Sequence, residues 1–323
     1  MNPSRRLLQS RVPKARGQRG AALLTAMIIV TLVTTLAGSM LWQQWRAVQV
    51  EAAERARSQA AWMLNGALDW ARLILKEAAK SGGGSVTSLD QPWATPFEEA
   101  RLSTFLAVDS AHTDDAPEAF LSGSIVDAQS RYNLTNLSRD GKVVEAEQQV
   151  LERLCQNLGL AADVAARIAV ALNDARAGAA NAPLLPATVG QLGWLWIDAE
   201  TVRQLAPYVA LLPEPTPLNI NTAPREVLAA VIKGLDLGSA ERLVQTRQRK
   251  PFANLAAVEQ LLPTLGKPDP KQLGTTSNYF EVRGRLRLLD RVLEELSLVQ
   301  RKGARDAVVL QRERVSSHQP GGA

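Results

Sequence analysis

The sequence predicts an α+β protein with a long N-terminal helix, a small antiparallel sheet and a large inserted all-α domain. Three observations lead to this prediction. An uncharged apolar run near the N-terminus continues directly into an amphipathic helical stretch. Strand-like alternation occurs before residue 138 and returns after residue 278. Between these stretches, residues 138–274 are rich in Ala, Leu and Arg and have the apolar period of helices.

The first 42 residues have the composition of a membrane anchor behind a basic leader. Residues 1–20 contain six Arg and Lys side chains and no acid, and residues 21–42 are uncharged. About 22 apolar residues, at a rise of about 1.5 Å each, span a bilayer core of about 30 Å. Since cationic flanks stay in the cytoplasm, we expect a single-pass membrane protein whose N-terminus is in the cytoplasm and whose remainder is exported.

The helix is expected to continue to residue 80, apolar all round in its first half and amphipathic in its second. Residues 47–80 contain no Pro and one Gly, Gly66. One buried stripe is predicted at Ala60, Leu64, Ala67, Leu68, Ala71, Ile74, Leu75 and Ala78. The run Ser81-Gly82-Gly83-Gly84 ends the pattern.

Residues 81–137 are predicted to form the first part of the head. Within them, residues 85–122 are expected to be irregular. The acidic run at residues 109–118 has two interpretations, a solvated loop or a calcium site built from closely spaced oxygen ligands. The candidate ligands are Asp109, Asp114, Asp115 and Glu118. A short hairpin is then expected, with strands at 124–126 and 131–134.

Residues 275–315 are predicted to complete the head with antiparallel strands. Apolar and polar residues mostly alternate from Tyr279 to Leu288, and two further candidate strands follow. Residues 316–323 have the composition of a disordered tail.

The inserted domain contains an internal repeat, G-L-x4-A-x2-[I/L], at Gly159 and again at Gly234. A Gly turn that opens a helix, with Ala at the close contact, is typical of helix-hairpin-helix (SAM-like) units. In the second copy, Asn221 or Thr222 is the expected cap before Pro224. Such units often bind DNA phosphates, but Asp236 replaces the second turn glycine, and its carboxylate would repel phosphate. A packing module is therefore the favoured interpretation of the two units.

Composition argues against several other functions. The formal charge is +5, but without residues 1–20 the chain keeps 31 basic and 32 acidic residues, a charge of −1. The single cysteine, Cys155, excludes an intramolecular disulfide, and two histidines exclude a multi-histidine metal site. No nucleophile–base pattern or phosphate-binding loop is present, so we expect no enzyme and no required cofactor, with calcium as the one candidate.

The leader resembles the class III leaders of type IV pilins and type II secretion pseudopilins. Its small residue, Gly20, stands before the apolar core rather than after it. The resemblance implies that the prepilin peptidase cuts between Gly20 and Ala21 and methylates the amine of Ala21. The alternatives are a plain N-terminal anchor, or a signal peptide cut near Ala37-Gly38-Ser39.

Nearly end to end, the chain resembles the K-type minor pseudopilins of the type II secretion system. The resemblance is carried by the leader together with Pro92-Trp93-Ala94, Ile125-Val126-Asp127, Tyr132-Asn133-Leu134, residues 218–223, Pro251-Phe252 and residues 277–280. It implies a pilin-like head with residues 138–274 inserted, and a place at the tip of a periplasmic pseudopilus that promotes assembly and export. It also implies I- and J-type partners, contacts with other pseudopilins and processing by the prepilin peptidase, with no nucleic acid.

Thr25, the fifth residue after Gly20, is the position that points to the tip. Most pilin-like subunits have Glu there, which neutralises the N-terminal amine of a neighbour. A carboxylate in the bilayer is costly unless it is paired, and a tip subunit has no subunit above it to pair with. A membrane-anchored helix-hairpin-helix DNA receptor of the competence type remains the alternative function, and a DNA gel-shift separates the two.

Overall fold

The structure, a computed structural model, describes residues 18–81, 86–101, 119–178, 181–265, 267–288 and 291–315. The chain divides into two compact units, residues 1–59 and 60–323. The long helix α1 (Gln18–Ser81) has 64 residues, which confirms the predicted continuous helix. Residues 18–59 of α1 belong to the first unit, and the part from Ala60 onward belongs to the second.

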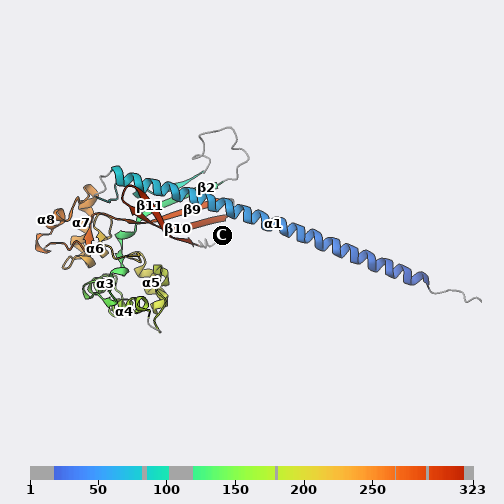
Figure 1. Cartoon of the computed structure of the whole chain (residues 1–323), viewed down its shortest axis with the longest axis horizontal. Helices are drawn as coiled ribbons and strands as arrows, with labels where there is room; N and C mark the ends of the chain where they lie inside the picture. Colours follow the sequence, from blue (N-terminus) through green and yellow to red (C-terminus); the bar gives the residue numbers. More distant parts are fainter. Residues whose placement is uncertain are drawn as a thin grey trace, which may run out of the picture. The chain divides into compact units, whose positions relative to one another are not determined.

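In the second unit, α1 lies along a five-stranded antiparallel sheet (Figure 1). The strand order is β1-β2-β9-β10-β11. The strands are β1 (Phe97–Arg101), β2 (Ala119–Asp127), β9 (Tyr279–Leu288), β10 (Arg291–Lys302) and β11 (Asp306–Val315). Strands β2 and β9 are neighbours although about 150 residues separate them, with Ile125 opposite Val282. The sheet is therefore built from both ends of the chain's second unit.

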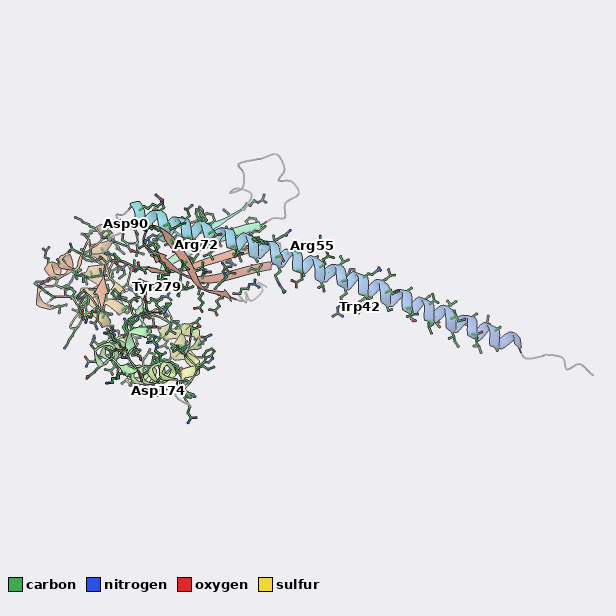
Figure 2. All side chains as sticks on the ribbon, in the orientation of Figure 1. Trp42, Arg55, Arg72, Asp90, Asp174 and Tyr279 are labelled. Carbon is green, nitrogen blue, oxygen red and sulfur yellow. The ribbon has the colours of Figure 1, made fainter. Side chains whose placement is uncertain are left out.

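A small core joins helix and sheet. Leu68, Ala71 and Leu75 of α1 pack against Phe280, Val282 and Val299 of the sheet, as the predicted stripe requires. The ring of Trp93, in the 3₁₀ helix η1 (Pro92–Ala94), meets Phe280 edge to face at 5.3 Å. Arg72, labelled in Figure 2, reaches from α1 to the backbone carbonyl of Ala307 on β11.

Two strand predictions were wrong. Residues 124–126 and 131–134 do not pair as a hairpin, because β2 lies between β1 and β9. Strand β3 (Tyr132–Asn133) instead pairs in parallel with β6 (Val209–Ala210). The stretch expected to be irregular contains β1, whose pairing with β2 is broken by a bulge. Both errors concern pairings between segments whose partners lie elsewhere in the chain.

Between β2 and β9 the chain forms the helical region. Its α-helices are α3 (Glu145–Asn157), α4 (Val164–Ala177), α5 (Ala199–Leu205), α6 (Arg225–Val231), α7 (Leu237–Arg249) and α8 (Leu255–Leu261). The 3₁₀ helices are η2 (Ala128–Ser130), η3 (Leu134–Leu137), η4 (Val189–Leu195) and η5 (Pro263–Leu265). Short ladders pair β4 (Ser138–Arg139) with β5 (Lys142–Val143) and β7 (Leu218–Asn219) with β8 (Leu273–Gly274). One apolar core extends through this region from Tyr132 to Leu273.

Each copy of the sequence repeat lies in a helix–turn–helix pair, α3–α4 and α6–α7, whose helices are labelled in Figure 1. Gly159 and Gly234 both have positive φ, 71° and 82°, a conformation that glycine adopts at little cost. Ala165 and Ala240 are both fully buried, as expected for the close helix contact.

The predicted cap of the second pair was wrong. Neither Asn221 nor Thr222 caps α6, whose N-cap is Pro224 without a side-chain hydrogen bond. Asn221 instead exchanges two hydrogen bonds with the backbone of Phe252. Asp236 caps the next helix, α7, by accepting from the backbone N–H of Ser239 at 2.9 Å.

Candidate functional site

The N-terminal part of α1 is a membrane-spanning candidate by length and composition. It belongs to the single described helix that is long and apolar enough to cross a bilayer. In Figure 2 its side chains, Trp42 among them, project from the ribbon on all sides. Residues from Ala21 to Val50 are all exposed, so the apolar surface has no cover within the first unit.

The polar side chains of this apolar segment are satisfied inside the helix. The hydroxyl of Thr25 donates to the backbone carbonyls of Ala21 (3.0 Å) and Ala22 (2.9 Å). Thr31, Thr34, Thr35 and Ser39 bond back to the preceding turn in the same way. An unpaired polar group in hydrocarbon costs several kcal/mol. The segment therefore presents no unsatisfied hydroxyl to a lipid environment.

The structure describes some of the predicted site residues and not others. Gly20 and Ala21 lie in the first turns of α1. The leader up to residue 17 and the calcium candidates Asp109, Asp114, Asp115 and Glu118 lie outside the described residues. Within the residues that are described, no cluster of three or more His, Cys, Asp or Glu could hold a metal ion. Cleavage, methylation and calcium binding remain predictions.

A buried polar junction forms where the sheet meets the helical region, and Asp127 lies at its centre. The carboxylate is 1% exposed. Its Oδ2 accepts from Ser277 Oγ (2.6 Å), Thr222 Oγ1 (2.6 Å) and Asn219 Nδ2 (2.9 Å). Its Oδ1 accepts from the backbone N–H of Gln129 at 2.8 Å. Burial raises the pKa of Asp127, while these hydrogen bonds act to lower it.

Arg301 of β10 extends the junction toward the segment that follows α1. Its Nη2 donates to Thr87 Oγ1 (2.8 Å) and to the carbonyl of Ser277 (2.7 Å), and its guanidinium lies 4.8 Å from the Phe280 ring centre. Burial lowers the pKa of Arg301, and the negative charge of Asp127 opposes that shift. The carboxylate of Asp127 therefore bonds to residues 219–222 and to Ser277, and Arg301 joins Ser277 to Thr87.

Tyr279 makes a second connection between sheet and helical region (Figure 2). Its hydroxyl donates to Glu214 Oε1 at 2.5 Å and accepts from Gln300 Nε2 at 2.9 Å. Burial raises the pKa of Tyr279, and the hydrogen bond to Glu214 raises it further. The side-chain oxygen of Gln129 accepts a further hydrogen bond from the backbone N–H of Asn278 at 2.6 Å.

Two asparagines hold the chain that leads into the second helix pair. Asn133 Nδ2 donates to the carbonyl of Glu214 at 2.8 Å. Asn136 exchanges two hydrogen bonds of 3.0 Å with the backbone of Thr216. Buried amides that satisfy backbone groups in this way fix one packing of the segment. The junction is thus arranged to hold parts together, since its polar groups are enclosed and bonded to one another.

The sequence pointed to these residues but not to their relationship. Asp127, residues 218–223 and residues 277–280 stood out as separate motifs, and the structure brings them into one network. The role of Arg301 was missed. The sequence signal for this role is an arginine near the end of a predicted strand. The inward positions of that strand are mostly apolar, so an unpaired charge among them would be costly.

Comparisons with known proteins decide the family. Two family models, both described as type II secretion system (T2SS) protein K, match residues 218–276 and 130–214. These segments include Asn133, Asn136, Asn219 and Thr222 of the junction, whereas Asp127, Ser277 and Arg301 lie outside them. The type II secretion system protein K of Pseudomonas aeruginosa is 29% identical over 312 residues, covering 88% of this chain and 90% of that protein. The chain belongs to the type II secretion system protein K family.

Other relatives agree. The protein K of Pectobacterium carotovorum subsp. carotovorum is 28% identical, covering 90% of this chain and 95% of that protein. A chain from the crystal structure of the GspK-GspI-GspJ complex of enterotoxigenic Escherichia coli superposes with a TM-score of 0.62 at 23% identity. That alignment covers 82% of this chain and 99% of the other, and it shows the shared fold. The protein is thus a minor pseudopilin of type II secretion, a structural subunit and not an enzyme.

Proposed function

We propose that this chain occupies the tip of the periplasmic pseudopilus, where it assembles with I- and J-type minor pseudopilins. In this role it promotes pseudopilus assembly and the export of proteins across the outer membrane. The leader faces the cytoplasm, the apolar part of α1 crosses the inner membrane once, and the head is periplasmic. The prepilin peptidase removes residues 1–20 and methylates Ala21.

The observation that carries the proposal is Thr25. A hydroxyl bonded to its own helix offers no charge to the amine of another subunit. A subunit along the shaft needs such a charge for the neighbour above it, whereas a tip subunit does not. The crystallised relative, whose title names a complex of GspK with GspI and GspJ, supports the choice of partners.

The helix–turn–helix pairs serve as packing modules in this proposal, as helix-hairpin-helix units without nucleic acid. Asp236 occupies the backbone N–H of Ser239, a group that would otherwise bind a phosphate at the N-terminus of α7. A DNA gel-shift tests this part. Submicromolar affinity at about 0.15 M salt, falling steeply as salt rises, would favour a DNA receptor instead.

The position along the filament is tested by immunogold labelling or site-specific cross-linking of pseudopili, with secretion scored in parallel. We expect label at one end of each pseudopilus and a loss of secretion when the gene is deleted. Repeated label along the shaft would refute the tip assignment.

A further inference from the structure

The segment between α4 and α5 exposes several large apolar side chains; both helices are labelled in Figure 1. Residues 177–197 contain no charged residue, and they form the longest such run outside the apolar part of α1. Trp196 is 71% exposed and Trp194 is 46% exposed. Leu184 and Leu185 of the same segment are exposed as well. An uncharged segment that exposes large apolar side chains is a candidate interaction surface.

Trp196 has a backbone conformation that a bulky residue rarely adopts. Its φ is 57°, in the left-handed region that favours glycine. Strain of this kind persists only where the surrounding structure imposes it, and it is concentrated at functional sites. Glycine at this position would avoid the strain, so the fold itself gives no reason for an indole here.

The residues around Trp196 hold it in this conformation. Leu195 and Ile197, on either side of it, are buried in the apolar core of the helical region. The backbone N–H of Trp196 donates to the carbonyl of Gly193 at 3.1 Å. Because its two neighbours are fixed in the core, the indole of Trp196 is presented to the outside.

The two exposed indoles keep their polar N–H groups available. Neither Trp194 nor Trp196 makes a hydrogen bond through its side chain within the part of the chain that the structure describes, whereas the indole N–H of the buried Trp93 donates to Gln91. Tryptophan combines an apolar ring with one polar N–H, and it is enriched at the level of lipid headgroups for this reason.

The charged groups that follow the segment are already bonded within the chain. Asp198 accepts from the backbone N–H of Thr201 at 2.9 Å, and Glu200 pairs with Arg203. A charged partner surface would therefore find no counter-charge here, and burying its charges unpaired would be costly. The boundary between headgroups and acyl chains accepts apolar and aromatic side chains without needing a counter-charge.

We infer that Trp194 and Trp196 insert into the headgroup region of the phospholipid bilayer to which α1 tethers the chain, and so hold the helical region on the surface of the inner membrane. This inference rests on the membrane insertion proposed above. The contact is a weak and reversible one, because few apolar side chains make it.

The size of the surface argues for a bilayer rather than a second protein. Trp side chains bury up to about 250 Å² each, so the two indoles together expose roughly 300 Å². A stable two-protein interface needs about 800 Å² per partner. A bilayer that already holds α1 is always near the head, and at a high effective concentration a weak contact is sufficient.

The test measures the depth of residue 193 in a bilayer. Gly193→Cys, in a Cys155→Ser background, carries a nitrobenzoxadiazole fluorophore next to both indoles, and a Cβ at this position meets nothing within 4 Å. The full-length chain is reconstituted in vesicles of phosphatidylethanolamine and phosphatidylglycerol whose acyl chains carry bromine, which quenches the fluorophore. We expect quenching several-fold stronger than for the same fluorophore on Leu261→Cys, an exposed position of α8.

Trp196→Gly separates membrane contact from folding. Glycine relieves the left-handed conformation, so the melting temperature should be unchanged or higher, while most of the quenching at residue 193 should be lost. Asp140→Gly is the matched control. Asp140 is the other described non-glycine residue with a positive φ, 52°, so the same backbone change is made without removing an indole. Quenching in this variant should equal that of the wild type.

The outcomes distinguish the inference from the proposed function. Equally weak quenching at residues 193 and 261, in vesicles that retain the chain, would overturn the inference and leave the proposed function standing. Shielding of the fluorophore only after I- and J-type pseudopilins are added would identify a protein as the occupant, which also overturns it. If alkaline carbonate extracts the wild-type chain from the vesicles, the proposed membrane topology fails and the inference fails with it.

Discussion

Thr222 donates a 2.6 Å hydrogen bond to the carboxylate of Asp127, although 95 residues separate them in the chain. Asp127 ends a strand of the sheet, and Thr222 lies in the segment leading into the second helix pair. The bond is enclosed and shares its acceptor oxygen with Ser277 and Asn219. The helical region is therefore held to the sheet by specific polar bonds as well as by apolar contact.

Asp127→Asn should destabilise the folded chain by about 1–3 kcal/mol. The substituted amide has one acceptor oxygen, so at least one of the N–H groups of Asn219 and Gln129 would face another N–H group. Urea denaturation of the purified chain measures the change. Thr222→Val, which removes one donor, is the milder comparison at about 1 kcal/mol. Equal stability of Asp127→Asn and wild type would show that the network does not hold the parts together.

Asp236→Ala should lower the denaturation midpoint more at neutral pH than in acid. Hydrogen bonds from the Ser239 side chain and backbone lower the pKa of Asp236. A carboxyl whose folded pKa is lowered stabilises the fold above its unfolded pKa of about 3.8, and this contribution is lost as pH falls through the folded value. Denaturation at pH 7 and near pH 3 measures the difference. Asp236→Asn, which can still cap but cannot ionise, should lie between wild type and Asp236→Ala at pH 7 and close to wild type in acid.

Cys155 should react slowly with maleimides in the folded chain. The thiol is 1% exposed, and burial raises its pKa to about 11, so little thiolate is present at pH 8. Urea should accelerate labelling by exposing the side chain and restoring its ordinary pKa. Since Cys155 is the single cysteine, mass spectrometry reads the result directly. Rapid labelling without denaturant would mean that α3 opens in the native state.

The mature protein should begin at Ala21. The basic leader ends in Gly20 directly before the apolar helix, which the prepilin peptidase leaves attached to its product. N-terminal sequencing of membrane-extracted protein, combined with mass measurement for the added methyl group, checks this. The bulky Gly20→Val should leave the precursor uncut, whereas Gly20→Ala should be partly processed. A start near Met40 would instead indicate signal peptidase.

Thr25→Glu should weaken membrane insertion by about 2–3 kcal/mol, or allow the subunit to enter the shaft. At the tip the new carboxylate finds no amine from an overlying subunit, and it replaces a hydroxyl that is satisfied within its own helix. Carbonate extraction and cross-linking position along pseudopili measure the two effects. Thr25→Ser, which keeps the hydroxyl, is the control. Normal insertion of Thr25→Glu at the tip would remove the reason given for the missing acid.

The sequence by itself determined the elements whose signals are local. The uninterrupted run from the apolar segment to Lys80 predicted α1, and the alternation after Tyr279 predicted β9, β10 and β11. The G-L-x4-A repeat located both helix turns, because a left-handed glycine and a buried alanine are required at fixed spacing. In each case the physical cause lies within a few turns of chain.

Tertiary structure alone decided where the polar side chains bond. Thr222 and Asn221 had the position and chemistry of helix caps, yet one bonds to Asp127 and the other to Phe252. A short polar side chain can serve a local cap or a distant partner equally well, and the packing of β2 against β9 determines which partner is in reach. Gly123 and Gly284 are a second example. They lie opposite each other because β2 pairs with β9, although 161 positions separate them in the chain.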